Sequence, residues 1–125
     1  MNTVGIICEY NPFHNGHAKQ LGAINGVKVC LMSGNYVQRG EPALLDKFTR
    51  AKAAVLCGAD LVLELPLTYA IASAEGFARG GVEVLTRLGC IDGLCFGSES
   101  GEIEDIMSTA RLLLTEPFRA ALRSE

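Results

Sequence analysis

Several features that define large protein classes are scarce or missing in this sequence. It contains no tryptophan, and its charged residues make up 20% of the chain with a net formal charge of −3 at pH 7. That charge supplies no overall basic field, whereas proteins that bind nucleic acid usually carry one. No apolar run nears the length that crosses a bilayer, and the N-terminus lacks the basic region of a signal peptide. We therefore expect a cytoplasmic protein without a membrane segment.

The cysteines show no pattern typical of a disulfide framework or a metal site. The chain has five, an odd number, and none forms a CxxC pair; they are Cys8, Cys30, Cys57, Cys90 and Cys95. We interpret them as small buried apolar residues in a reducing compartment. The two histidines have no third ligand nearby, so the sequence predicts no metal site.

The spacing of the apolar residues predicts an α/β protein. Short apolar runs predict buried parallel strands at residues 3–8, 27–32, 61–65 and 93–96. Helical patterns alternate with them at residues 16–24, 42–58 and 77–88, and a last clear helix follows Ser100, which can cap it. This alternation predicts a Rossmann-like parallel sheet with flanking helices. We expect one domain over residues 1–116, while residues 117–125 begin a further helix that stops without a cap.

The helix predicted to begin at Pro42 has two contrasting sides. Its apolar positions, which we expect to face the core, are Leu44, Phe48, Ala51 and Val55. The charged positions on the opposite side are Asp46, Lys47 and Arg50. These residues form either a solvated, ion-paired face or, through the cations Lys47 and Arg50 together with Arg39 in the preceding loop, a clamp for pyrophosphate or a carboxylate. The position of the loop after a central strand favours the clamp.

The most informative segment is the turn His14-Asn15-Gly16-His17, which follows the first predicted strand. Two residues three apart on a first helical turn point the same way, and Gly16 between them lets a ligand approach the backbone. We expect unpaired backbone amides of the helix N-terminus beside the rings. The alternative is a loop that merely ends in polar residues, but the strand before the turn and the helix after it favour a phosphate site.

Such a site suits attack on the α-phosphate of a nucleotide. Negative charge builds on the phosphate oxygens during that reaction, and preorganised N–H donors lower its barrier. Gly97, directly after the last predicted strand, either ends that strand or lets adenine or ribose lie against the backbone. Both interpretations of Gly97 stay open.

Four segments, in this order, resemble one known family: GIICEYNPFHNGH, MSGNYVQRGEPALLDKFTRA, GADLVLELP and CFGSES. They are similar to the bacterial tRNA(Met) cytidine acetate ligases, members of the HIGH-type nucleotidyltransferase-like superfamily. The HxGH motif alone indicates the superfamily, whereas the EYNPFHNGH and SGNxVQRGEPA blocks indicate the family. The resemblance covers nearly all of the chain and implies the HIGH-type nucleotidyltransferase fold.

The resemblance also implies an activity and its residues. Members use ATP, which we expect with Mg²⁺, to activate acetate as acetyl-adenylate, and then transfer the acetyl group to N4 of the wobble cytidine of elongator tRNA(Met). The implied catalytic residues are His14, His17 and Lys47, while Arg39 and Arg50 stay candidates for the clamp because of their charge and position. The implied ATP-binding residues are Ile7, Cys8, Glu9, Tyr10, Asn11, Pro12, Phe13, His14, Asn15, Gly16, His17 and Gly97.

The chain departs from the family pattern in two ways. The segment between His17 and Val29 is shorter, by about one helical turn, so we expect a trimmed first helix. Members are also much longer, so we expect this chain to be an N-terminal portion and the tRNA to bind through sequence that is absent here. Two other functions stay open: an adenylyl or cytidylyl transferase acting on a small phosphorylated acceptor, and a non-catalytic nucleotide-binding module. No pattern indicates an oligomeric state.

Overall fold

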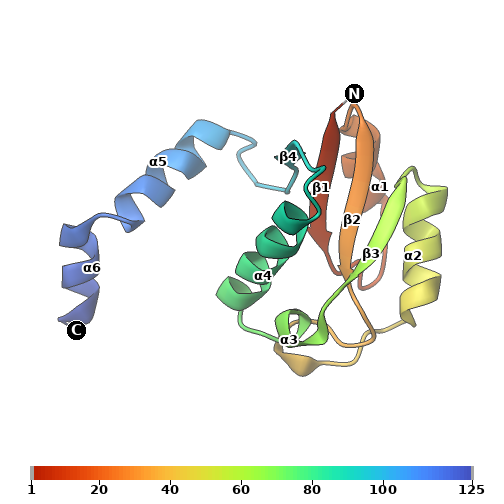
Figure 1. Cartoon of the computed structure of the whole chain (residues 1–125), viewed down its shortest axis with the longest axis horizontal. Coiled ribbons are helices and arrows are strands. Elements are labelled where there is room, and N and C mark those ends of the chain that lie inside the picture. The colour runs from red at the N-terminus through yellow and green to blue at the C-terminus, as the bar shows by residue number, and fades with distance from the viewer. Residues whose placement is uncertain (1, 125) are drawn as a thin grey trace.

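The computed structural model describes residues 2–124 and contains a parallel sheet of four strands (Figure 1). The strands are β1 (Thr3–Cys8), β2 (Val27–Ser33), β3 (Leu61–Leu65) and β4 (Gly93–Leu94), arranged in the order β3-β2-β1-β4. All of their pairings are parallel. The structure confirms the predicted Rossmann-like sheet with flanking helices.

The strand register explains why β4 is shorter than predicted. β1 and β2 pair along their full common length, from Thr3 with Val27 to Cys8 with Met32. β4 pairs with β1 through two residues only, and a last hydrogen bond joins the Cys95 N–H to the Gly5 carbonyl at 2.9 Å. Beyond that bond the chain leaves the sheet, so the predicted strand at 93–96 ends early.

Helices cover both faces of the sheet. The helices are α1 (Asn15–Ala23), α2 (Lys47–Leu56), α3 (Leu67–Ala70), α4 (Ala74–Arg87), α5 (Ile103–Leu113) and α6 (Glu116–Arg123), with a short 3-10 turn η1 (Gln38–Gly40). α1 and α2 pack on one face and α3 and α4 on the other (Figure 1). Each face has its own apolar cluster, one around Leu21 and Ala54 and the other around Ala70 and Leu85. The sequence pattern did not predict α3, which is a single turn.

Two consecutive glycines let α4 lie close to its neighbours. A Cβ added at Gly80 would come within 2.2 Å of the Tyr69 ring, and one at Gly81 within 2.6 Å of the Ile7 side chain. Real Cβ atoms are not found at such distances from other heavy atoms. The glycines weaken the helix intrinsically, yet they bring it close to β1 and α3.

The predicted helix at 42–58 begins later, and it is rotated about its axis relative to the prediction. α2 starts at Lys47 because the Asp46 side chain accepts the Phe48 and Thr49 N–H groups at 2.9 and 3.0 Å, which caps the helix. The side that packs on the sheet carries Arg50 and Ala54, whereas Phe48 is 75% exposed. The prediction that Arg50 lies on the polar face opposite the core is therefore wrong.

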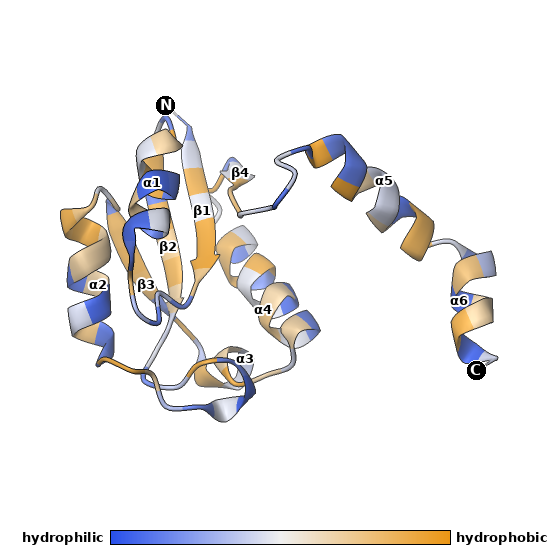
Figure 2. Ribbon diagram, turned by 180° about the vertical axis from the view of Figure 1, so that it is seen from behind, coloured by the Kyte–Doolittle hydropathy of each residue, from blue (hydrophilic) through white to orange (hydrophobic). Residues whose placement is uncertain are grey.

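The last two helices lie apart from the sheet (Figure 1). Both were predicted, but α5 begins after Glu102 rather than at a Ser100 cap. Apolar side chains of α5 stay exposed, including Ile103 at 52% and Leu112 at 60%, and Figure 2 shows apolar and polar residues interleaved along it. The domain boundary at residue 116 stays a prediction. Among residues 2–124, no helix is long and apolar enough to cross a membrane.

Candidate functional site

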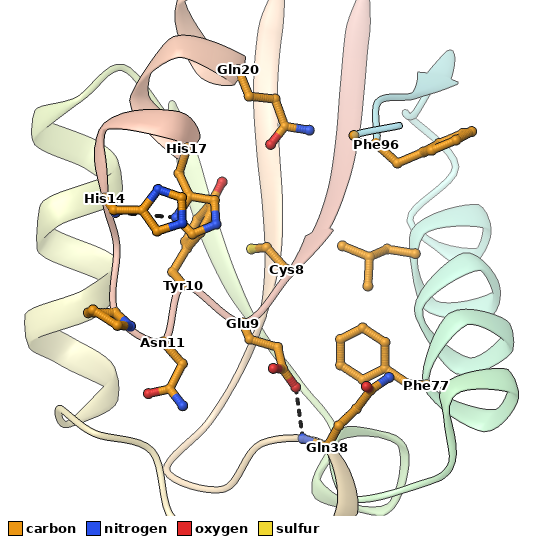
Figure 3. Close-up of a pocket in the computed structure, with 13 residues that line it drawn as sticks. Cys8, Glu9, Tyr10, Asn11, His14, His17, Gln20, Gln38, Phe77 and Phe96 are labelled. Carbon is orange, nitrogen blue, oxygen red and sulfur yellow. Dashed lines mark hydrogen bonds between the residues drawn. The ribbon is translucent and has the colours of Figure 1, made fainter. Parts of the chain in front are cut away.

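A cavity of about 500 Å³ lies at the carboxyl end of β1, between α1 and α4 (Figure 3). We call it the histidine cavity. Its lining includes these residues of the predicted ATP-binding set: Ile7, Cys8, Glu9, Tyr10, Asn11, Pro12, His14, His17 and Gly97. Four further residues line it: Gln20, Gln38, Phe77 and Phe96. Phe13, Asn15 and Gly16, also in the predicted set, are not part of this lining.

The two histidines cap α1 with their own side chains. His14 is the N-cap residue, and its Nδ1 accepts the Gly16 N–H at 3.1 Å. His17 reaches back, and its Nδ1 accepts the His14 N–H at 3.3 Å. This is a capping box in which imidazoles replace the usual hydroxyl and carboxylate.

The capping bonds determine which ring nitrogen carries the proton. A neutral imidazole has one N–H, so a ring that accepts through Nδ1 carries its proton on Nε2. The two rings stack with their centroids 3.7 Å apart and their planes 23° from parallel. Figure 3 shows them side by side next to Tyr10 at the edge of the cavity. In their neutral forms, both His14 and His17 therefore offer an Nε2–H donor.

The surroundings of His17 favour its neutral form. Its ring packs against the Tyr10 ring at a centroid distance of 4.8 Å and against Phe13 at 5.5 Å. Burial, with a smaller contribution from the charge of His14, lowers the pKa of His17 below its usual value of 6.5. At neutral pH the ring is therefore an uncharged donor rather than a cation.

The capping box corrects part of the prediction of unpaired backbone amides. The Gly16 N–H is taken by the His14 ring, and the His17 N–H donates to the His14 carbonyl at 3.0 Å. Within residues 2–124 the Asn15 N–H makes no hydrogen bond, so the donors that remain for a ligand at this turn are this amide and the ring Nε2–H groups. The two rings lie on the same side of the helix, as their i, i+3 spacing predicts.

Glu9 connects the floor of the cavity to the loop that follows β2. Its carboxylate accepts the Gln38 N–H at 2.7 Å, as Figure 3 shows. Gln38 lies in the η1 turn, so this bond brings the 34–46 loop to the wall of the cavity. The predicted set contains Glu9 but not Gln38, because only the tertiary fold brings that turn against β1.

The structure does not bring the predicted clamp residues to the histidine cavity. Lys47 forms an ion pair with Glu64 at 2.6 Å and lines a separate cavity of about 340 Å³ against β3. Arg39 is exposed in the η1 turn, with a φ of 65°. Arg50 is buried and donates to backbone carbonyls. None of the three is among the lining residues of the histidine cavity.

Phe77 and Phe96 are the lining residues that could have been found from the sequence. Phe96 precedes Gly97 at the carboxyl end of a predicted strand, which is where ligands lie in such sheets. Phe77 begins a predicted helix on the neighbouring face, and its ring closes the side of the cavity toward α4 (Figure 3). Two aromatic rings beside a backbone turn suit a flat, apolar group such as a nucleobase.

The chain is similar in sequence to proteins of one known family. The family model described as HIGH Nucleotidyl Transferase matches residues 1–125. The tRNA(Met) cytidine acetate ligase of Clostridium novyi is 52% identical over 123 residues, covering 94% of this chain and 30% of the relative. The tRNA(Met) cytidine acetate ligase of Acetivibrio thermocellus is 47% identical over 133 residues, covering 100% of this chain and 32% of the relative.

Solved structures agree with the sequence relatives. The crystal structure of Thermotoga maritima TmcAL bound with alpha-thio ATP superposes with a TM-score of 0.85 and 47% identity. The match covers 90% of this chain and 29% of that one. This chain therefore spans about a third of the length of the relatives that it matches.

Proposed function

Because this chain belongs to the HIGH nucleotidyl transferase family, we propose that its histidine cavity binds ATP for attack on the α-phosphate. The observation that carries the proposal is the capping box, which leaves both rings with Nε2–H donors beside the cavity. A similar chain, 47% identical, was crystallised with alpha-thio ATP. The aromatic rings of Phe77 and Phe96 supply the apolar wall that a nucleobase needs.

The imidazoles act as fixed hydrogen-bond donors. Negative charge on the non-bridging oxygens of the α-phosphate grows as the nucleophile attacks, and a donor already in place strengthens with that charge. The capping bonds hold His14 and His17 in orientation, so little reorganisation is needed at the moment of reaction. No covalent intermediate with the protein is required.

We propose that Mg²⁺ reaches this site with the nucleotide. Within residues 2–124, no group of three or more His, Cys, Asp or Glu side chains is placed to hold a metal ion. Mg²⁺ at nucleotide sites is typically bound by phosphates and one or two carboxylates. Glu9 is the carboxylate on the described lining of the cavity, so the donor set fits a cation that is carried mainly by the phosphates.

We infer the identity of the acceptors from the name of the relatives. Their name, tRNA(Met) cytidine acetate ligase, leads us to propose that this chain is the nucleotide-binding portion of such an enzyme. In that reaction acetate attacks the α-phosphorus of ATP, pyrophosphate leaves, and acetyl-adenylate passes its acetyl group to N4 of the wobble cytidine of elongator tRNA(Met). The net charge of −3 fits a chain whose tRNA contacts lie in sequence beyond this portion. A cytoplasmic location follows from this function.

Calorimetry with ATP tests the first half of the proposal. The wild-type chain should bind ATP, and His14→Ala and His17→Ala should each weaken binding. Lys19→Ala, an exposed position on the same helix, is the matched control and should bind as the wild type does. An absence of ATP uptake by the wild-type chain would contradict the proposal.

Exchange of pyrophosphate into ATP tests the second half. Exchange that requires acetate indicates acetyl-adenylate formation, whereas an adenylyl transferase would require a phosphorylated acceptor and retain the nucleotide in its product. ATP binding without any exchange would favour a non-catalytic module. The product with acetate and tRNA present should be acetylated RNA, AMP and pyrophosphate.

A further inference from the structure

Arg50 is a fully buried cation that is held by hydrogen bonds to backbone carbonyls. It is 1% exposed, and its guanidinium donates to the backbone carbonyls of Leu45 at 3.0 Å, Glu9 at 2.5 Å, and Gly34. No carboxylate within residues 2–124 forms an ion pair with it. Burying a cation costs free energy that neutral carbonyls offset only in part. Packing alone therefore does not account for an arginine at this position.

The three carbonyls belong to segments that meet at the histidine cavity. Glu9 follows β1 and lines the cavity, while Gly34 and Leu45 lie near the two ends of the loop that follows β2. Between these ends, the loop reaches the cavity through Gln38, whose N–H donates to the Glu9 carboxylate at 2.7 Å. The planar guanidinium spans all three carbonyls at once because its donors point in fixed, divergent directions.

We propose that Arg50 is a positioning residue for the nucleotide site. By joining both ends of the 34–46 loop to the end of β1, it holds Glu9 and Gln38 at their places in the cavity wall. It acts through these backbone carbonyls and does not touch the nucleotide. The inference rests on the proposed function, since ATP is the ligand whose site is held in place.

The variant Arg50→Lys tests this role because lysine keeps the charge but lacks the planar fork. If the loop is in place only one-tenth of the time, the Kd for ATP should rise about tenfold, since the apparent Kd scales inversely with the competent fraction. The Gln38 amide should exchange with solvent faster, while the β2 amides stay protected. Lys52→Ala, at an exposed position of the same helix, is the matched control and should change neither quantity.

Each outcome bears on the proposal. Wild-type ATP affinity in Arg50→Lys, together with faster exchange at Gln38, would overturn it. The second variant, Arg50→Gln, also removes the charge and should weaken ATP binding at least as much. If both variants lose protection throughout β2, Arg50 supports the whole fold rather than the cavity, which also overturns the proposal. If the wild-type chain binds no ATP, the proposed function fails. The role of Arg50 is still tested in that case, because the exchange of the Gln38 amide is measured without any nucleotide.

Discussion

Replacing His14 with asparagine or with alanine separates the two interactions of its imidazole. The Nδ1 atom caps α1 through the Gly16 N–H, and in the neutral ring the opposite nitrogen, Nε2, carries the proton. Asparagine is among the preferred N-cap residues, so His14→Asn keeps an acceptor for the helix, whereas His14→Ala loses it. The asparagine side chain is too short to place a donor where Nε2–H lies.

The two variants should therefore differ in stability but agree in binding. His14→Ala should lower the free energy of unfolding by about 1 kcal/mol, the usual cost of a lost N-cap, and His14→Asn by much less. Both should raise the Kd for ATP by about 10- to 100-fold, because a hydrogen bond to a charged group contributes about 1.5–3 kcal/mol. This difference follows from the assignment of Nδ1 to the helix and Nε2 to the ligand.

Urea unfolding followed by circular dichroism measures the stability of each variant, and calorimetry measures its ATP affinity. A His14→Asn chain that binds ATP as tightly as the wild type would refute the role of Nε2–H. Equal stability of the asparagine and alanine variants would show that the ring does not cap α1. A variant of Lys19, exposed on the same helix, controls for a general effect of substitution there.

Three other predictions follow from the same structure. Because the pKa of His17 is lowered below 6.5 in the folded chain, the contribution of this ring to the free energy of unfolding should be greatest above pH 6.5 and should decrease as the pH falls toward the lowered pKa. The variant His17→Gln should reduce this dependence on pH, as measured by urea unfolding at a series of pH values. Gly80→Ala should destabilise the fold by about 1–3 kcal/mol through overpacking. Gly22→Ala should stabilise the fold by about 0.5–1 kcal/mol, because the space around the added Cβ is open. If thermal unfolding ranks the two variants the other way, the packing of α4 described above is contradicted. Asp46→Ala should lower the free energy of unfolding, and Asp46→Asn should lower it by less because asparagine keeps an acceptor for the cap; urea unfolding measures both, and equal losses would contradict the cap.

The sheet could be predicted because its strands are short apolar runs bounded by turn residues. The first and third strands end at the predicted residues, and the second extends by one, to Ser33. The length of β4 was overestimated because Cys95 and Phe96 continue the apolar pattern, although the strand ends at Leu94 and the Cys95 N–H makes the last hydrogen bond to β1. The start of helix α2 was misplaced because Pro42 suits a first helical turn, whereas the Asp46 cap determines the actual start.

The candidate site was predictable only where local sequence places side chains. The i, i+3 spacing placed His14 and His17 beside each other, and the carboxyl-end rule placed Gly97 on the same cavity. The burial of Arg50 could not be predicted, because helical periodicity groups it with charged neighbours and the carbonyls that hold it come from distant segments. The pairing of Lys47 with Glu64 likewise depends on how α2 packs against β3.

The proposed function requires that both imidazoles present Nε2–H groups to the phosphates of a bound nucleotide. Nitrogen-15 NMR of the histidine rings, recorded while ATP is titrated into the wild-type chain, observes these groups themselves. We predict that both rings carry their proton on Nε2 before ATP is added and that both Nε2 signals shift on binding, with the Nδ1 signals little changed. Rings protonated on Nδ1, or Nε2 signals that do not respond to saturating ATP, would contradict the account.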